Sequence, residues 1–251
     1  MALVIGLLTA VLIAVTTARS GTLSRGQLQQ DLEFTQSRLE ALKNLRDLTR
    51  DYLWLDDTWV LAFRIAGGGG RPSYEAFYNR TAGSSSLEDV CGQSRNYRNA
   101  QLLDNWPSSL VDTVRVSVRK NGEEVAFTDF NGGGSKFDSW FKKDRVINST
   151  WTDIKAQTAL HFSIAGYKWR RFYMCKNHGG CANDAGWMAV LDIYDSCKGV
   201  WFHANTHTPV ILYSTQSHFV KFASTDMDVA DEMVIAVKLR DVLTCPGTCT
   251  A

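Results

Sequence analysis

The sequence has almost no excess charge of either sign, because 27 Lys and Arg residues face 26 Asp and Glu residues, for a formal net charge of +1. This balance argues against a generally basic nucleic-acid binder and against an acidic solvating tail. Proline is also scarce, with 4 residues, which excludes proline-rich and collagen-like sequence. The hydrophobic fraction is 45%, which is too high for a disordered chain and sufficient for a packed core.

Long apolar segments are also missing. The one strongly apolar run covers residues 2–15 and is too short to cross a bilayer, which takes ~20 residues. Small residues follow it before Arg19, so residues 1–20 are typical of a signal peptide cleaved near Ala18 or Ser20. We therefore expect a secreted, extracellular protein with no membrane span after signal removal. The alternative is a cell-surface protein that keeps the same segment as an N-terminal anchor.

Two short motifs agree with export. Asn79-Arg80-Thr81 and Asn148-Ser149-Thr150 match the acceptor sequence for N-glycosylation, and neither contains proline. A glycan cannot enter a packed core, so we expect Asn79 and Asn148 to lie on exposed loops.

Six cysteines in an exported chain are expected to form disulfides. Cys245 and Cys249 can close locally around a Pro-Gly turn, and Cys181 can pair with Cys197 across a predicted strand. That set leaves a long-range bond between Cys91 and Cys175, although six cysteines allow ~15 connectivities. A competing hypothesis is a zinc site at the closely spaced residues Cys175, His178 and Cys181.

The segment that follows the signal peptide has helical periodicity. Leucines recur at helical spacing from Leu28 to Leu55, and neither Gly nor Pro interrupts residues 27–66. This pattern predicts a helical stalk over residues 21–57, with residues 24–55 joining copies of the chain into a homo-oligomer through a coiled coil. The alternative is a single amphipathic helix that packs on its own domain.

The remaining chain is predicted to be rich in β-structure. Asn121-Gly122 lies between two alternating runs, 113–120 and 123–130, which predicts a hairpin with a type I′ turn. A two-residue loop would place Val118 opposite Val125 and Val116 opposite Phe127 on the core face, and Arg119 opposite Glu124 on the other face.

Further strands are predicted wherever short β-branched and aromatic runs occur between Gly- and Asn-rich connections. They cover residues 58–65, 160–164, 171–174, 187–194, 210–214 and 233–239. The predicted fold class is therefore mainly β, with an antiparallel β-sandwich or jelly-roll-like domain over residues 58–242 and a cysteine-containing tail over 243–251.

No catalytic motif is recognisable, but two groups of residues are candidates for a site. Asp226, Asp228 and Asp231 alternate in a predicted loop, and their hard oxygen ligands suit Ca²⁺; the alternative is a solvated acidic loop. His203 and His207 are four residues apart, in a predicted loop that precedes a strand.

Aromatic side chains provide the candidate ligand-binding surface, because they stack on sugars and anchor protein interfaces. The chain has 8 Trp and 8 Tyr residues, and Lys168-Trp169-Arg170-Arg171 combines aromatic with basic character. That motif is expected either to contact an anionic glycan or to cover a strand edge. The predicted ligand-binding residues are Trp169, Arg170, Trp201, His203 and His207.

Three sequence blocks together resemble a group of uncharacterised secreted proteins from marine invertebrates. The blocks are Phe130-Asn131-Gly132 with Ser139-Trp140-Phe141, the run from Gly180 to Trp187, and Leu212-Tyr213-Ser214. The resemblance implies an extracellular single-domain module over roughly residues 59–238 and carries no activity or functional residue with it.

These observations favour a non-enzymatic, secreted binding or matrix module. It would be lectin-like, with a glycan or protein ligand, and would gain avidity from multimerisation by the stalk. The alternative is a secreted hydrolase that uses residues outside any known motif, with His203, His207 and the acidic run as first candidates. No nucleic acid is expected among its partners.

Overall fold

A computed structural model describes residues 59–79, 96–193, 195–201 and 207–240, together with a few positions between 26 and 36. The chain divides into two compact units, residues 1–50 and 51–251. In the first unit the described positions have helical backbone, and the Gln29 side chain donates a hydrogen bond to Glu33 one turn later (3.1 Å). The predicted signal peptide, most of the stalk and the cysteine-containing tail lie outside the described residues.

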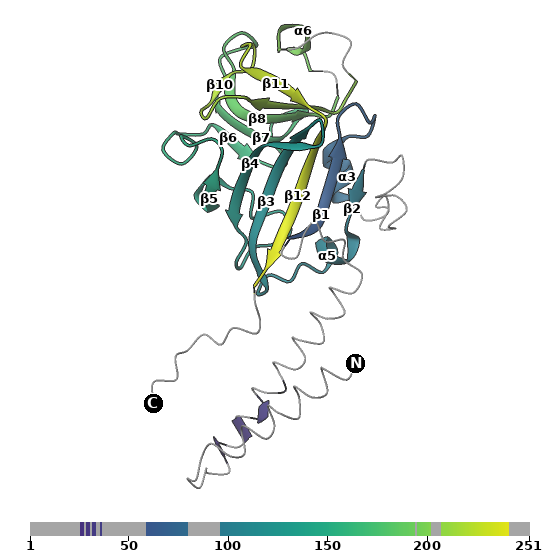
Figure 1. The fold of residues 1–251 in the computed structure, drawn as a ribbon, viewed down its shortest axis with the longest axis vertical. Coiled ribbons are helices and arrows are strands. Elements are labelled where there is room, and N and C mark those ends of the chain that lie inside the picture. The colour runs from purple at the N-terminus through teal and green to yellow at the C-terminus, as the bar shows by residue number, and fades with distance from the viewer. Residues whose placement is uncertain are drawn as a thin grey trace. The chain divides into compact units, whose positions relative to one another are not determined.

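Two antiparallel sheets make up the second unit, as predicted for a mainly β protein (Figure 1). In order, the strands of the first sheet are β2 (Tyr97–Arg98), β1 (Trp59–Ala66), β12 (Glu232–Leu239), β3 (Val111–Lys120), β4 (Glu123–Asn131) and β5 (Val146–Ser149). Those of the second are β11 (Met227–Ala230), β9 (Val210–Ser214), β8 (Ala185–Leu191), β7 (Arg170–Asn177) and β6 (His161–Ser163), with β10 (Val220–Lys221) paired to β8.

The helical elements are short and lie in the connections. They are α3 (Ser73–Tyr78), α5 (Ala100–Asp104), the 3₁₀ turn η1 (Lys143–Arg145) and α6 (Lys198–Trp201). Among the residues that the structure describes, no helix has the length and apolar character needed to cross a membrane.

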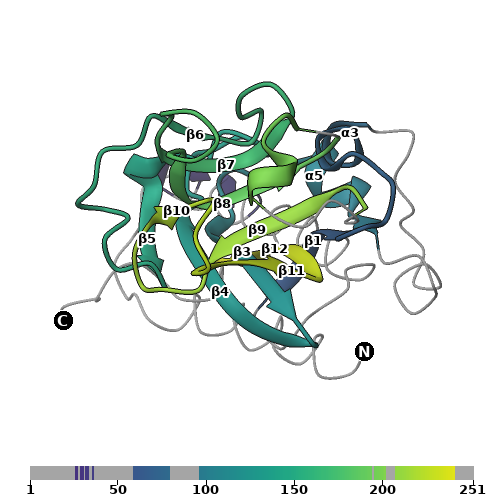
Figure 2. The ribbon, with the colours of Figure 1, turned by 90° about the horizontal axis from the view of Figure 1, so that it is seen from above.

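Aromatic rings connect the two sheets into a common core. Phe63 of β1 lies 6.3 Å from Phe172 of β7, and Phe130 of β4 lies 6.1 Å from Phe162 of β6, measured between ring centroids. Figure 2 shows the sheets as separate layers, with β6 and β7 above β4 in that view. Phe77 of α3 packs edge-on against Phe172 (5.6 Å), so this helix closes one end of the core.

The Asn121-Gly122 hairpin is confirmed, but its register differs from the prediction. Both turn residues have positive φ (53° and 81°), and Arg119 pairs with Glu124 as expected. Val118, however, lies opposite Ala126, because Val125 is an extra residue that bulges from β4. The predicted Val118–Val125 and Val116–Phe127 pairs are therefore wrong.

The bulge has a clear packing consequence. It turns Ala126, Thr128 and Phe130 toward the core and leaves Val125 39% exposed. Phe127 then faces outward, where the Arg115 guanidinium lies 4.2 Å from its ring.

The other predicted strands occur within a few residues of the expected positions, as β1, β6, β7, β8, β9 and β12. Four strands were not predicted, and the most informative of them is β11. It occupies residues 227–230, inside the acidic run that was predicted to be a loop.

Glycine at the hairpin turn gives a direct test of this local geometry. Gly122→Ala places a Cβ at φ 81°, where space is open but the backbone conformation is strained, so we expect the free energy of unfolding to fall by ~1 kcal/mol in urea titrations. Gly199→Ala is the matched control, because Gly199 lies in α6 with equally open space around it. The control should leave stability unchanged or slightly higher; equal losses in the two variants would contradict the assigned turn.

Candidate functional site

The second sheet is buried on both of its faces. Phe172 of β7 contacts the first sheet, whereas the next residue, Tyr173, belongs to a separate apolar cluster on the opposite face. That cluster includes Cys175, Leu191, Leu212, Trp201 and Phe222. Segments 177–184, 195–201 and 219–224 supply its outer cover, and the Cys181–Cys197 disulfide joins the first two of these segments.

A bulge in β7 determines which side chains reach this outer cluster. Arg171 pairs with Val190 and Met174 with Met188, so β7 contains one residue more than β8 between these pairs. Phe172 has a φ of 42°, which is unusual for a bulky residue and marks the bulge. The extra residue interrupts the alternation of faces and brings Arg170 and Tyr173 to the same side of the sheet.

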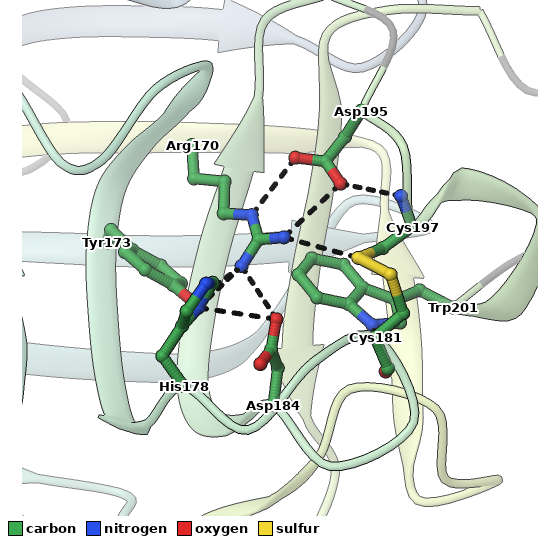
Figure 3. The surroundings of a disulfide bond; sticks show 8 residues. All are labelled: Arg170, Tyr173, His178, Cys181, Asp184, Asp195, Cys197 and Trp201. Atoms are coloured by element: carbon green, nitrogen blue, oxygen red, sulfur yellow. Dashed lines mark hydrogen bonds and ion pairs between the residues drawn. A yellow bond between two sulfur atoms is a disulfide. The ribbon is translucent and has the colours of Figure 1, made fainter.

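Arg170 is the centre of a buried charge cluster (Figure 3). Only 4% of the residue is exposed. Its Nη1 donates to Oδ2 of Asp184 (2.8 Å) and its Nε to Oδ2 of Asp195 (3.0 Å). Burial alone would lower the pKa of the guanidinium, but hydrogen bonds with Asp195, Tyr173 and Asp184 raise this pKa above its ordinary value. The arginine is therefore permanently charged.

The remaining contacts of Arg170 fix the groups around it. Its Nη1 donates to the Tyr173 hydroxyl (3.1 Å), its Nη2 to Sγ of Cys197 (3.3 Å), and its guanidinium lies 4.2 Å from the Trp201 ring. Nη1 also lies 3.2 Å from Nδ1 of His178. Because a guanidinium only donates, Nδ1 accepts this hydrogen bond, and neutral His178 carries its proton on Nε2.

Asp184 retains unused hydrogen-bonding capacity. The residue is fully buried, and its Oδ1 has no hydrogen-bond partner in the described part of the protein, while Oδ2 contacts Arg170 and lies 3.4 Å from Nδ1 of His178. Two carboxylates thus share one guanidinium, an arrangement that depends on the arginine remaining in place.

An aromatic stack extends from this cluster to the surface. The His161 ring is stacked between Tyr167 (5.1 Å between centroids) and buried Tyr173 (5.6 Å), and His178 lies edge-on to Tyr167 (5.3 Å). Tyr167 is 37% exposed and Trp169 is 49% exposed. Burial, followed by the charges of His178 and Arg170, lowers the pKa of His161, so its neutral form is favoured.

The connection between β6 and β7, which carries Tyr167 and Trp169, is held by backbone hydrogen bonds. Tyr167 N donates to Arg170 O (3.0 Å), Arg170 N donates to Tyr167 O (3.1 Å), and Trp169 O accepts from Asp192 N (3.0 Å). Gly166 and Lys168 adopt the left-handed conformation that this tight turn needs (φ 62° and 54°). We call Tyr167, Lys168, Trp169, His161 and His178 the hairpin surface.

Arg171 points to a different part of the molecule from Arg170. Its guanidinium lies 4.6 Å from the Tyr74 ring and 3.6 Å from Asp192. The Asp192 carboxylate, directly after β8, accepts hydrogen bonds from the backbone N–H groups of Ser73 (2.6 Å) and Tyr74 (2.9 Å) and so caps the start of α3. Burial raises the pKa of Asp192. The predicted basic–aromatic motif is thus divided between three environments.

The predicted ligand-binding residues fall into two groups. Trp169 and His207 are exposed, whereas Arg170 and Trp201 are buried, so the latter two present almost no surface to a ligand in this structure. The bulge in β7 and the cover provided by α6 account for their burial. His203 lies outside the described residues.

The predicted calcium ligands have separate partners. The Asp228 carboxylate contacts Lys120 Nζ (2.6 Å) and the Tyr213 hydroxyl (3.2 Å), and Asp231 accepts from Asn121 N (2.6 Å). Asp226 accepts from Gln216 (3.1 Å). Burial alone would raise the pKa of Asp228, but the hydrogen bonds from Lys120, the Val229 backbone and Tyr213, together with the charge of Lys120, lower it overall.

The structure does not gather these three carboxylates into one site, because Asp228 lies on β11 while Asp226 and Asp231 flank that strand, and each has its own partners. Over the whole described part of the chain, no group of three or more His, Cys, Asp or Glu side chains could hold a metal ion.

The cysteine predictions have mixed outcomes. The Cys181–Cys197 disulfide is confirmed. Cys175 carries a free, buried thiol that donates to the Asn177 carbonyl (3.0 Å), so its predicted bond to Cys91 is wrong, as is the zinc hypothesis that used Cys175 and Cys181. Burial raises the pKa of the Cys175 thiol to about 11. Cys91, Cys245 and Cys249 lie outside the described residues.

Of the two predicted glycosylation residues, Asn79 lies in irregular backbone and Asn148 lies on a strand instead of the expected loop. Asn148 is exposed on β5, at the edge of the first sheet, and half-buried Asn79 directly follows α3 as its C-cap.

Sequence reasoning missed His161 and Tyr167 of the hairpin surface and most of the side chains that support it. His161, Tyr167, Asp184 and Asp195 belong to no catalytic or metal-binding motif, and of these only Asp184 lies in a segment that the sequence analysis singles out, the run from Gly180 to Trp187. When the chain was compared with models of protein families, with curated proteins and with solved structures, nothing matched. The resemblance to secreted marine-invertebrate proteins therefore stays a prediction.

Removal of the central guanidinium should be costly. Arg170→Ala leaves two buried carboxylates without compensation, and we expect the free energy of unfolding to fall by ~3–5 kcal/mol in urea titrations. Arg170→Lys keeps the charge but loses the planar fork, so it should lose less and remain folded if the alanine variant does not.

The control for this experiment is Arg240→Ala. The Arg240 side chain is 54% exposed and lies 3.8 Å from Asp112, and an exposed pair contributes only ~0–1 kcal/mol. A loss at Arg170 no larger than that at Arg240 would show that the cluster does not stabilise the fold.

Proposed function

We propose that the protein is a secreted, lectin-like binding module that recognises a glycan through its hairpin surface. The observation that carries the proposal is the exposure of Tyr167 and Trp169 on a turn held by paired backbone hydrogen bonds. Large aromatic side chains exposed together are typical of recognition surfaces, because their apolar faces stack on sugar rings and their polar edges remain hydrated.

The support behind this surface suits binding. Arg170 fixes the turn through its backbone and His178 through its side chain, so the surface is ordered before any ligand arrives. An ordered surface loses little conformational entropy on association, which favours affinity.

The same neighbourhood offers little that suits catalysis. The Cys175 thiol is buried, and its pKa of about 11 disfavours the reactive thiolate. Asp184 and Asp195 are engaged with Arg170. These groups act as structural support, which is why a binding module is proposed ahead of a secreted hydrolase.

The proposal also concerns the fold of the β-rich head and the assembly of several heads. The two sheets would be the halves of a jelly-roll-like β-sandwich, in line with the rings that link β1 to β7 and β4 to β6. Residues 24–55 would assemble several such heads, so that weak contacts between single heads and glycans add up to useful avidity.

The glycan proposal is tested on a glycan array with the full chain and two matched variants. Trp169→Ala should weaken binding at least about tenfold, which corresponds to ~1.4 kcal/mol. Ile147→Ala is the control, because Ile147 has the same exposed fraction (49%) but lies on β5, away from the hairpin surface. The proposal fails if no glycan binds, or if Trp169→Ala binds as well as the unchanged protein.

The oligomer proposal is tested by sedimentation of the chain with and without residues 19–57. We expect an oligomer for the longer chain and a monomer for the shorter one, since the apolar stripe lies between Leu28 and Leu55. A monomer in both cases would refute multimerisation by the stalk.

A further inference from the structure

The exposed charged side chain on the hairpin surface is basic, whereas the neighbouring acidic side chains are buried. Three carboxylates lie close to it, but Asp184, Asp192 and Asp195 are all at most 5% exposed. Each of them is already bound to a buried arginine or to backbone N–H groups. Their negative charge is therefore largely neutralised before it reaches solvent.

The basic groups, in contrast, are accessible. Lys168 is exposed at the tip of the turn, and its Nζ lies 5.4 Å from the Tyr167 ring centroid. The side chain of His178 is 32% exposed. A cation and a histidine thus lie beside the exposed Tyr167 ring, next to Trp169 in the same turn.

The buried cluster also sets the hydrogen-bonding role of His178. Because Nδ1 accepts from Arg170, the proton of the neutral ring is on Nε2, and Nε2 is the nitrogen left to donate to a ligand. His178 can therefore donate to an anion without being protonated. An exposed ammonium group and a fixed N–H donor are a suitable pair for a carboxylate or sulfate oxygen.

We propose that the ligand of the hairpin surface is an anionic sugar, whose ring stacks on Trp169 or Tyr167 while its acidic group binds Lys168 Nζ and His178 Nε2. This inference rests on the proposed glycan-binding function and adds the charge of the ligand. The acidic group can be a uronic-acid carboxylate or a sulfate, since both offer the same oxygen acceptors.

The experiment measures the affinity of the full chain for three oligosaccharide probes of similar length. Hyaluronan carries only carboxylates, heparin carries sulfates as well, and dextran is neutral. We expect one or both acidic probes to bind and the neutral probe to bind at least about tenfold more weakly. Affinity should fall as salt rises from ~0.05 to ~0.5 M, because exposed charges are screened. The acidic probe that binds more tightly identifies the group.

Two variants separate charge recognition from stacking. Lys168→Gln and His178→Ala should each weaken binding of the acidic probe about three- to tenfold and reduce its salt dependence. Lys142→Gln is the control, because Lys142 is also exposed but lies beside η1. It should change neither quantity.

The outcomes are distinguishable from those of the glycan proposal itself. If dextran binds as well as the acidic probes, or if Lys168→Gln has no effect while Trp169→Ala abolishes binding, glycan recognition stands and the anionic ligand is refuted. If none of the probes and no glycan on the array binds, both proposals are refuted.

Discussion

The structure depends most on the hydrogen bonds that satisfy the donors of one buried guanidinium, that of Arg170. Placing Arg170 at 4% exposure has a large desolvation cost, which is offset only if every donor finds a partner. The partners come from separate segments, since Tyr173 lies on β7, Asp184 ends the 177–184 segment and Asp195 precedes α6. A single side chain therefore determines where the cover of the second sheet must lie. The Cys181–Cys197 disulfide joins the same two covering segments and limits their separation when the interior contacts open.

The same arginine links the interior to the surface. Its backbone makes both hydrogen bonds that close the turn carrying Tyr167, and its side chain sets the acceptor role of His178 Nδ1. The stacking of His161 between Tyr167 and Tyr173 continues this connection through packed rings. The contacts that hold the buried cluster in place therefore also hold the side chains of the hairpin surface in place.

Local sequence patterns were sufficient to predict many of the strands. Alternating runs around Asn121-Gly122 predicted a real hairpin, and apolar runs predicted the central strands β9 and β12. What escaped prediction depends on single inserted residues. One bulge, at Val125, shifted the predicted pairing of β4, and another, at Phe172, placed Arg170 inside although its sequence neighbours are basic and aromatic. Sequence periodicity does not reveal bulges. The extra residue can be identified only once the residues of the two neighbouring strands have been paired, because it is the one left without a partner.

Stability alone does not explain such a cluster. Well-packed apolar side chains of similar volume often replace buried ion pairs without loss of stability. Apolar groups, however, donate no hydrogen bond to His178 and bind no carboxylate from two different segments. A guanidinium has five donors in a fixed plane, and here they set the position of Asp184, the position of Asp195 and the tautomer of His178 together. The main role of the cluster is therefore to fix the positions of the side chains around Arg170, and through them the arrangement of the hairpin surface.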